Sequence, residues 1–200
     1  LIFVISCFIS YLIIDNMGFK NLIFTFLIAS AFYLFLTTLK DFFVKGFSNF
    51  SQKLSHFGFS LLILSILLNS FFSSEITANL RVGEKILFEN GVITFESIES
   101  KKYKNYQSIM GNFNIEDNEK KSIILNPELR IYNQPHTITS EADIKTTLYS
   151  DKFLVMNLVK GNEYFNIRYQ IKPFMVWIWI STLLIAMGGT HSLLRKNYEK

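Results

Sequence analysis

Residues 55–72 read Ser55-His56-Phe57-Gly58-Phe59-Ser60-Leu61-Leu62-Ile63-Leu64-Ser65-Ile66-Leu67-Leu68-Asn69-Ser70-Phe71-Phe72. The part after His56 carries no charge, and with Leu54 the run approaches the roughly 20 apolar residues that span the hydrocarbon core of a bilayer. His56 is one of three histidines and lies at the mouth of this run. An imidazole there can stay solvated, pair with a neighbouring side chain, or bind a metal centre held between helices.

Composition places the chain among membrane proteins. Hydrophobic residues make up 50% of the 200 residues, and the mean hydropathy is +0.26. Such values are typical of membrane helices joined to an extramembrane module. Apolar segments occupy residues 1–14, 21–39, 54–72 and 173–194. We therefore expect transmembrane helices in residues 1–72, a polar module in residues 73–172, and a last helix with a short tail in residues 173–200. The first segment is short and does not begin with Met, so we expect it to be a truncated transmembrane helix of a longer protein.

Charge predicts the orientation. The module holds 13 Lys/Arg and 13 Asp/Glu, so the net charge of +4 lies in the short loops and the tail. Cytoplasmic loops collect Lys and Arg. The connection around residues 40–53 and the C-terminus are therefore expected in the cytoplasm, and residues 73–172 outside it. A neutral module also argues against nucleic acid as a partner.

The polar module shows no pattern of a hydrolytic enzyme. It lacks GxSxG, HExxH and a Gly-rich phosphate loop, and His136 is its only histidine. We expect His136 to be a solvent-exposed loop residue, and we predict no catalytic residue in this chain. Cys7 is the only cysteine of the chain, so no internal disulfide and no Cys-based metal site can form.

Short β-prone runs indicate that the module is all-β. Asn90-Gly91 between two such runs favours a type I′ hairpin, because both turn positions readily take positive φ. Several short strands with turn signals predict a small sandwich or a partly open barrel. We also expect one short helical turn near residues 140–147, capped by Thr139 or Ser140. The expected strands are residues 86–89, 92–98, 113–115, 123–125, 129–132, 153–158 and 164–171.

The last apolar segment, residues 173–194, has features typical of a helix that enters a membrane. Pro173 suits the first turn of a helix, where its missing N–H would have no partner. Trp177 and Trp179 follow within two turns, as in an aromatic belt at the outer interface. Gly188 and Gly189 near the inner end would allow a close approach of helices.

Several stretches, taken in order, carry a resemblance to a known family. They are Ser55-His56-Phe57-Gly58; Pro127-Glu128-Leu129-Arg130-Ile131-Tyr132; Thr139-Ser140-Glu141-Ala142; the exit Arg168-Tyr169-Gln170-Ile171-Lys172-Pro173-Phe174-Met175-Val176-Trp177-Ile178-Trp179; and Ala186-Met187-Gly188-Gly189. From about Leu54 to Arg195 the chain resembles the C-terminal part of the CcmF/NrfE family, the cytochrome c maturation heme lyases.

The resemblance implies a many-helix protein of the bacterial inner membrane. Members of this family ligate a heme b between helices and attach heme to CxxCH motifs of apocytochrome c outside the membrane. His56 occupies the position of an axial ligand of that heme, which agrees with the chemistry of heme iron. The implied partners are apocytochrome c, a heme chaperone, other membrane subunits of cytochrome c maturation, and the lipid bilayer.

The sequence also departs from the family pattern. The Trp-rich segment and its flanking histidines, which present heme to the apocytochrome, are absent, because Trp177 and Trp179 are the only tryptophans. A second axial histidine would have to come from outside this chain, since His191 lies near the far end of the last helix, where a local interfacial role is expected. We therefore predict the C-terminal part of a heme lyase. The alternative is a non-catalytic β docking module anchored in the membrane, and a permease subunit has little support because the predicted spans contain no charged residue.

Overall fold

The computed structural model describes residues 1–16, 22–43, 50–89, 91–118, 121–159, 161 and 163–198. Its contacts divide the chain into two compact units. The first unit is Leu1–Phe72 with Pro173–Lys200, and the second is Ser73–Lys172.

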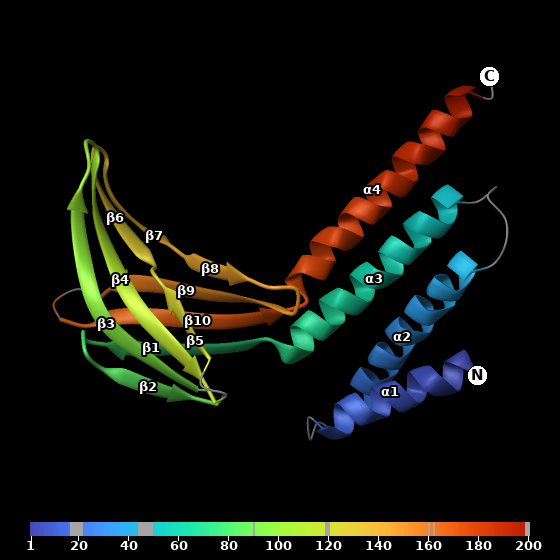
Figure 1. Ribbon diagram of the computed structural model, residues 1–200, viewed down its shortest axis with the longest axis horizontal. Helices are drawn as coiled ribbons and strands as arrows, with labels where there is room; N and C mark the ends of the chain where they lie inside the picture. The colour runs from blue at the N-terminus through green and yellow to red at the C-terminus, as the bar shows by residue number, and fades with distance from the viewer. Residues whose placement is uncertain are drawn as a thin grey trace. The chain divides into compact units, whose positions relative to one another are not determined.

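The first unit is helical. Its helices are α1 (Ile2–Asn16), α2 (Leu22–Phe43), α3 (Phe50–Phe72) and α4 (Met175–Tyr198), and each packs against the next along the chain (Figure 1). Among the described residues, three stretches are long and apolar enough to cross a membrane: Leu22–Phe43, Phe50–Phe72 and Met175–Leu194. The prediction of α-helical transmembrane segments is therefore confirmed, and α1 is a shorter apolar helix.

Helices α2 and α3 are joined by polar and aromatic contacts. The hydroxyls of Thr38 and Ser60 are 2.6 Å apart, and both side chains are buried. The ring of Phe57 packs against Phe35 and Phe42, with ring centres 5.6 and 5.2 Å away. A buried hydroxyl pair with aromatic packing around it fixes the contact of these two helices.

Helices α3 and α4 approach closely because glycines line their contact. A Cβ atom added to Gly58 would lie 3.0 Å from Leu184 and Ile185 of α4. A Cβ atom added to Gly188 would lie 2.8 Å from the carbonyl oxygen of Ser51. Any larger side chain at Gly188 would therefore meet the backbone of α3.

The second unit is a β-sandwich. Its strands are β1 (Ser74–Leu80), β2 (Lys85–Phe88), β3 (Gly91–Lys102), β4 (Tyr106–Asp117), β5 (Ser122–Leu125), β6 (Glu128–Asn133), β7 (His136–Glu141), β8 (Asp143–Thr146), β9 (Ser150–Leu158) and β10 (Phe165–Pro173). One sheet has the order β1-β10-β9-β8, and the other has the order β2-β3-β4-β6-β7, with β5 on β4 (Figure 1). Of the two all-β architectures predicted from the sequence, the structure is the sandwich.

Alternating side chains from both sheets form the core of the sandwich. Phe95 and Phe113 stack with their ring centres 4.2 Å apart, and both are fully buried. Leu154 and Ile167 from the opposite sheet are equally buried. The core therefore follows from the period-2 pattern of apolar residues in β3, β4, β9 and β10.

The predicted strands all occur, but the structure contains three more. Strand β1 pairs with β10, β7 pairs with β6, and β8 pairs with β9. The helical turn expected near residues 140–147 is wrong, because this segment forms the end of β7 and all of β8. The β-branched residues Ile144 and Thr146 favour an extended strand, and pairing with β9 supplies the backbone hydrogen bonds. Strands β2 and β3 form the predicted hairpin, whereas the type of its turn depends on Asn90, which lies outside the described residues.

The entry into α4 also differs from the prediction. Pro173 is the last residue of β10 rather than part of the first helical turn. Phe174 takes a positive φ of 61°, and its carbonyl oxygen accepts hydrogen bonds from the backbone N–H groups of Trp177 and Ile178. The backbone therefore turns at Phe174, and α4 begins at Met175.

Candidate functional site

His56 lies in the second turn of α3, because this helix begins at Phe50. The apolar segment identified in the sequence begins at Leu54, about one turn after the start of the helix. Residues 50–53, which precede this apolar segment, are less apolar. They continue the same helix, and its buried face begins at Leu54. Their helical structure gives the His56 backbone regular hydrogen bonds on both sides and fixes the direction of its side chain.

The side chain of His56 belongs to an exposed stripe of α3. Leu54, Gly58 and Leu61 are buried within the helical unit, whereas His56 and Phe59 are exposed. Exposed positions recur along the same helical face, at Gln52, His56, Phe59, Ile66 and Ser70. His56 therefore points away from the helices that pack on the other faces of α3.

The imidazole of His56 is free to bind a ligand. Within the described part of the chain it has no hydrogen-bond partner, and no three His, Cys, Asp or Glu side chains gather to hold a metal ion. Heme iron needs only one or two axial imidazoles, because the porphyrin supplies the other four bonds. His56 could supply one imidazole to such an iron.

The other two histidines are placed differently. In α4, Nδ1 of His191 lies 2.6 Å from the hydroxyl of Ser51, and its ring packs edge-on against Phe50. His191 therefore joins the ends of α3 and α4, as expected for a local role. His136 is exposed, as predicted, but it is the first residue of β7 rather than a loop residue.

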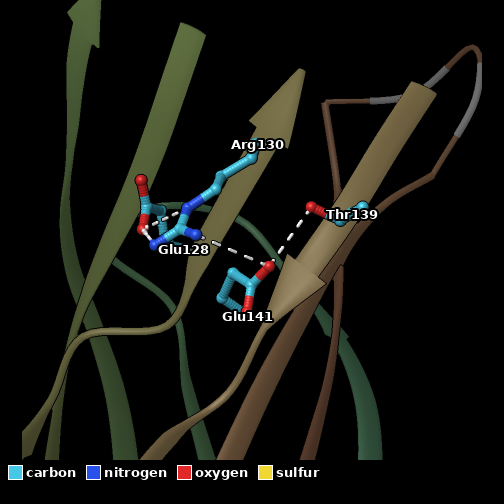
Figure 2. Close-up of polar contacts among 4 residues, drawn as sticks. All are labelled: Glu128, Arg130, Thr139 and Glu141. Atoms are coloured by element: carbon cyan, nitrogen blue, oxygen red, sulfur yellow. Dashed lines mark hydrogen bonds and ion pairs between the residues drawn. The ribbon is translucent and has the colours of Figure 1, made fainter. Parts of the chain in front are cut away.

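The β unit contains two of the motif stretches, Pro127–Tyr132 and Thr139–Ala142. Register pairing brings Glu128 opposite Glu141 and Arg130 opposite Thr139 on the outer face of β6 and β7. Figure 2 shows the guanidinium of Arg130 between the two carboxylates. Two nitrogens of Arg130 donate to Glu128 Oε2 at 3.0 and 2.8 Å, and Nη1 lies 3.8 Å from Glu141 Oε1. The structure thus joins the Pro127–Tyr132 and Thr139–Ala142 stretches into one cluster.

Electrostatics favours the charged form of this cluster. The hydrogen bonds from Arg130 hold the pKa of Glu128 below its ordinary value of 4.5, although partial burial opposes this shift. The same contacts raise the pKa of Arg130. The hydroxyl of Thr139 donates to Glu141 at 3.3 Å. The groups hold one another in place, which is typical of a structural cluster rather than of an acid–base pair.

The remaining motif residues lie outside this cluster. Pro127 is fully buried, and its carbonyl oxygen accepts a hydrogen bond from Gly111 N–H. Arg168 is exposed opposite Thr77 in the β1–β10 pair, and Lys172 follows near the end of β10. Tyr132 lies in β6 opposite Thr137. The motif residues outside the β unit lie in or beside the helices.

The motif residues in α4 are two tryptophans and two glycines. Trp177 and Trp179 are 37% and 64% exposed in its first two turns. Of these two glycines, only Gly188 makes the close helix contact, because a Cβ added to Gly189 would meet no other described residue within 4 Å. The expectation that both glycines serve this contact is therefore corrected.

Sequence reasoning missed several residues that position the helices. Thr38 and Ser60 pair through their hydroxyls, and Ser51 bonds His191. Asn69 donates from its side-chain amide to the carbonyl of Pro173 at 2.5 Å. Hydroxyl and amide residues inside apolar runs were the available signal, because such groups seek polar partners within the bilayer.

Comparisons with known proteins agree with this architecture. The family described as "CcmF C-terminal beta-sandwich" matches residues 71–173. The cytochrome c-type biogenesis protein CcmF of Pseudomonas aeruginosa is 25% identical over 76% of this chain and 23% of its own length. CcmF of Escherichia coli is 24% identical over 77% of this chain and 24% of its own length, and NrfE of Haemophilus influenzae is 24% identical over 88% and 28%. The chain therefore spans about a quarter of the length of these curated relatives.

A solved structure has the same fold. The structure named cytochrome c heme lyase CcmF superposes with a TM-score of 0.67 at 16% identity, over 93% of this chain and 33% of the other. This likeness extends over the helices as well as the β-sandwich. Since the family match covers more than half of the residues, the chain belongs to the CcmF/NrfE family and corresponds to its C-terminal segment.

Proposed function

We propose that this chain is the C-terminal part of a cytochrome c heme lyase and that His56 is one axial ligand of a heme b held in the membrane. The whole protein would attach heme to apocytochrome c during cytochrome c biogenesis. The names of the relatives support a role in this process. The position of the heme ligand rests on this chain's own residues.

The observation that carries the proposal is the free, outward-facing imidazole of His56. Most of the α3 surface is occupied by α2 and α4, yet the stripe that carries His56 is open. A polar side chain within a membrane helix normally faces a partner or a cavity, because burying it in lipid without a partner is costly. A heme between α3 and a helix outside this chain would provide that partner.

The role of this chain would be to hold and orient the heme. Heme, when bound, supplies the iron to which imidazole coordinates and the vinyl groups that are joined to the cysteines of the apocytochrome. His56 would fix one face of the iron, while α2 and α4 would keep the backbone of α3 straight behind it. A second histidine outside this chain would complete the axial pair.

The charge pattern supports the proposed location. The cationic connection around residues 40–53 and the C-terminal tail would lie in the cytoplasm of a bacterium, and the β-sandwich would lie in the periplasm. That arrangement would put the sandwich on the side where apocytochrome c, the heme chaperone and other maturation subunits act.

Removal of the imidazole tests the proposal. His56→Gly in the full-length protein should lose bound heme or change its reduced-minus-oxidised spectrum, while the amount of inserted protein stays the same. Added imidazole should restore the spectrum, because it can enter the space left by the side chain. The measurement is the heme-to-protein absorbance ratio of the purified variants, together with the yield of mature cytochrome c.

Two histidines provide matched controls. His136→Ala lies in the β-sandwich, and His191→Ala removes a residue that bonds Ser51 instead of facing the open stripe. Both should keep the wild-type spectrum. An unchanged spectrum for His56→Gly, or a loss that imidazole does not reverse in well-inserted protein, would refute the assignment.

A further inference from the structure

The hairpin of β3 and β4 ends in a tip that combines tyrosines and lysines. Strand β3 has 12 residues, so the tip lies roughly 36 Å along the strand from Gly91 at its other end. We call the side chains of Lys102, Tyr103, Lys104, Tyr106 and Tyr132 the tyrosine–lysine tip.

The aromatic rings of the tip form a continuous row. Tyr103 and Tyr106 stack with their ring centres 4.7 Å apart and their planes 19° from parallel. The ring of Tyr132 lies 5.4 Å from that of Tyr106, and Tyr103 is 47% exposed. Tyr106 and Tyr132 are half-buried behind it. Tyrosine is enriched at the centres of protein interfaces, where its ring supplies contact area.

The row is held rigidly from behind. The guanidinium carbon of Arg130 lies 5.4 Å from the ring centre of Tyr106, and Glu128 fixes that guanidinium with two hydrogen bonds. The backbone N–H of Tyr103 donates to the Tyr106 carbonyl at 2.9 Å, which closes the turn. A surface that is ordered before binding loses little side-chain entropy when a partner arrives.

The charge of the tip has one sign. Residues 100–115 and 129–140 contain Lys101, Lys102, Lys104 and Arg130 and no Asp or Glu, although the whole module is neutral. Arg130 is neutralised by Glu128, and Lys101 pairs with Glu99 at 3.2 Å. Lys102 and Lys104 are exposed and form no ion pair with another described residue. Two unpaired cations therefore flank the tyrosines.

We propose that the tyrosine–lysine tip is a docking surface for an acidic segment of a partner protein that also carries an aromatic or apolar side chain. The lysines attract carboxylates, and the tyrosine row accepts the apolar side chain. Polybasic membrane-binding sites use clusters of four to eight cations, and nucleic-acid sites neutralise several phosphates; two unpaired lysines are too few for either. The surface is independent of the heme site proposed above.

A binding experiment with the whole chain in nanodiscs of zwitterionic lipid tests this surface. The probe is a fluorescein-labelled peptide of alternating Glu and Phe, and its anisotropy is followed at two salt concentrations. Lys102→Glu with Lys104→Glu should weaken binding at least about fivefold, because two attractive pairs become repulsive. Tyr103→Ser should weaken it by a similar factor, as expected for an aromatic anchor.

The matched control changes the same net charge elsewhere. Lys85→Glu with Lys145→Glu replaces exposed lysines of β2 and β8, and it should leave the peptide affinity nearly unchanged. Equal weakening in the control would mean that net charge alone attracts the peptide, and it would overturn the proposal. The absence of peptide binding by the wild-type chain would do the same.

Two further probes separate other classes of partner. Vesicles of phosphatidylglycerol and single-stranded oligothymidine should bind the wild-type chain no more tightly than they bind the Lys102→Glu, Lys104→Glu variant. If either binds the wild-type tip more tightly than the peptide does, the occupant is a membrane or a nucleic acid and the protein-docking proposal is wrong. Circular dichroism of each variant checks that the sandwich is folded. None of these binding measurements uses the heme spectrum, so their outcome does not depend on the heme site.

Discussion

Gly188 of α4 lies directly against Ser55 of α3, the residue that precedes His56 along the chain. A Cβ atom at Gly188 would come within 2.9 Å of the backbone nitrogen of Ser55 and would also crowd its hydroxyl. This tight contact between the helices is therefore next to the candidate heme ligand along α3. The spacing of α3 and α4 at this level bears directly on the position of His56.

Gly188→Ala should loosen the contact between α3 and α4. The added methyl group meets backbone atoms, which cannot move aside as a flexible side chain would, so overpacking should cost about 1–3 kcal/mol of unfolding free energy. Unfolding of the chain in mixed micelles with increasing SDS measures this loss.

Gly189→Ala is the matched control for this prediction. It places the same methyl group one residue away, where no neighbouring element of the described structure lies within 4 Å. Alanine is the better helix former by about 1 kcal/mol, so this variant should be as stable as the wild type or slightly more stable. Equal destabilisation by the two substitutions would show that helix packing at Gly188 is not the cause.

The contrast between the two glycines illustrates what the sequence can and cannot predict. The pair Gly188-Gly189 indicates a close helix approach, but the rotation of α4 decides which glycine faces α3, and that rotation is fixed by packing. The apolar runs predicted the helices because length and hydropathy suffice for this inference. Their ends were less predictable: α3 extends back to Phe50 through polar residues.

In the β unit, too, some features could be predicted from the sequence and others could not. Strands with alternating apolar residues, such as those around Phe95 and Phe113, were predictable from their pattern. Strand β7 has exposed side chains at all positions but one, so no alternation marks it, and only its pairing with β6 reveals it. The Glu128–Arg130–Glu141 cluster likewise depends on register, which brings together residues about a dozen positions apart in the sequence.

The hydroxyl pair Thr38–Ser60 should stabilise the contact between α2 and α3. Its oxygens are 2.6 Å apart and buried, and hydrogen bonds between membrane helices contribute about 0.6 kcal/mol on average. A double-mutant cycle with Thr38→Val and Ser60→Ala, followed by SDS unfolding, should give a coupling energy of about this size. Thr37, one residue away, bonds its own helix at Tyr33 and Leu34, so Thr37→Val paired with Ser60→Ala should show no coupling.

The orientation of the chain can be tested with reporters. The cationic connection around residues 40–53 and the cationic tail predict that both face the cytoplasm and that the β-sandwich faces the periplasm. Alkaline phosphatase, which is active only in the periplasm, should be active when inserted at Asn118, between β4 and β5, and silent when fused after Lys200. A fluorescent protein that folds only in the cytoplasm should give the opposite pattern. Activity of the phosphatase at Lys200 alone would reverse the proposed topology.

Glu128 should give the β-sandwich a defined dependence on acid. Its pKa is held below 4.5 in the folded protein, chiefly by the hydrogen bonds from Arg130. A group whose pKa is lowered by folding stabilises the folded state above the unfolded pKa, and this contribution is lost as the pH falls through the folded pKa. The contribution of Glu128 is therefore complete above about pH 4.5 and disappears below it. Glu128→Gln should lower the thermal midpoint at neutral pH and reduce the loss between neutral and acid pH.

Glu141→Gln supplies the comparison for Glu128. Its carboxylate lies 3.8 Å from Arg130 and is 45% exposed, whereas the Glu128 contact is 2.8 Å and the side chain is 19% exposed. Solvent screens an exposed, longer contact, so Glu141→Gln should change the midpoint less and should keep most of the acid dependence. The β-sheet band of the circular dichroism spectrum, followed during heating at several pH values, measures both variants. If Glu128→Gln melts with the same pH dependence as the wild type, the hydrogen bonds from Arg130 do not carry the acid sensitivity of the sandwich.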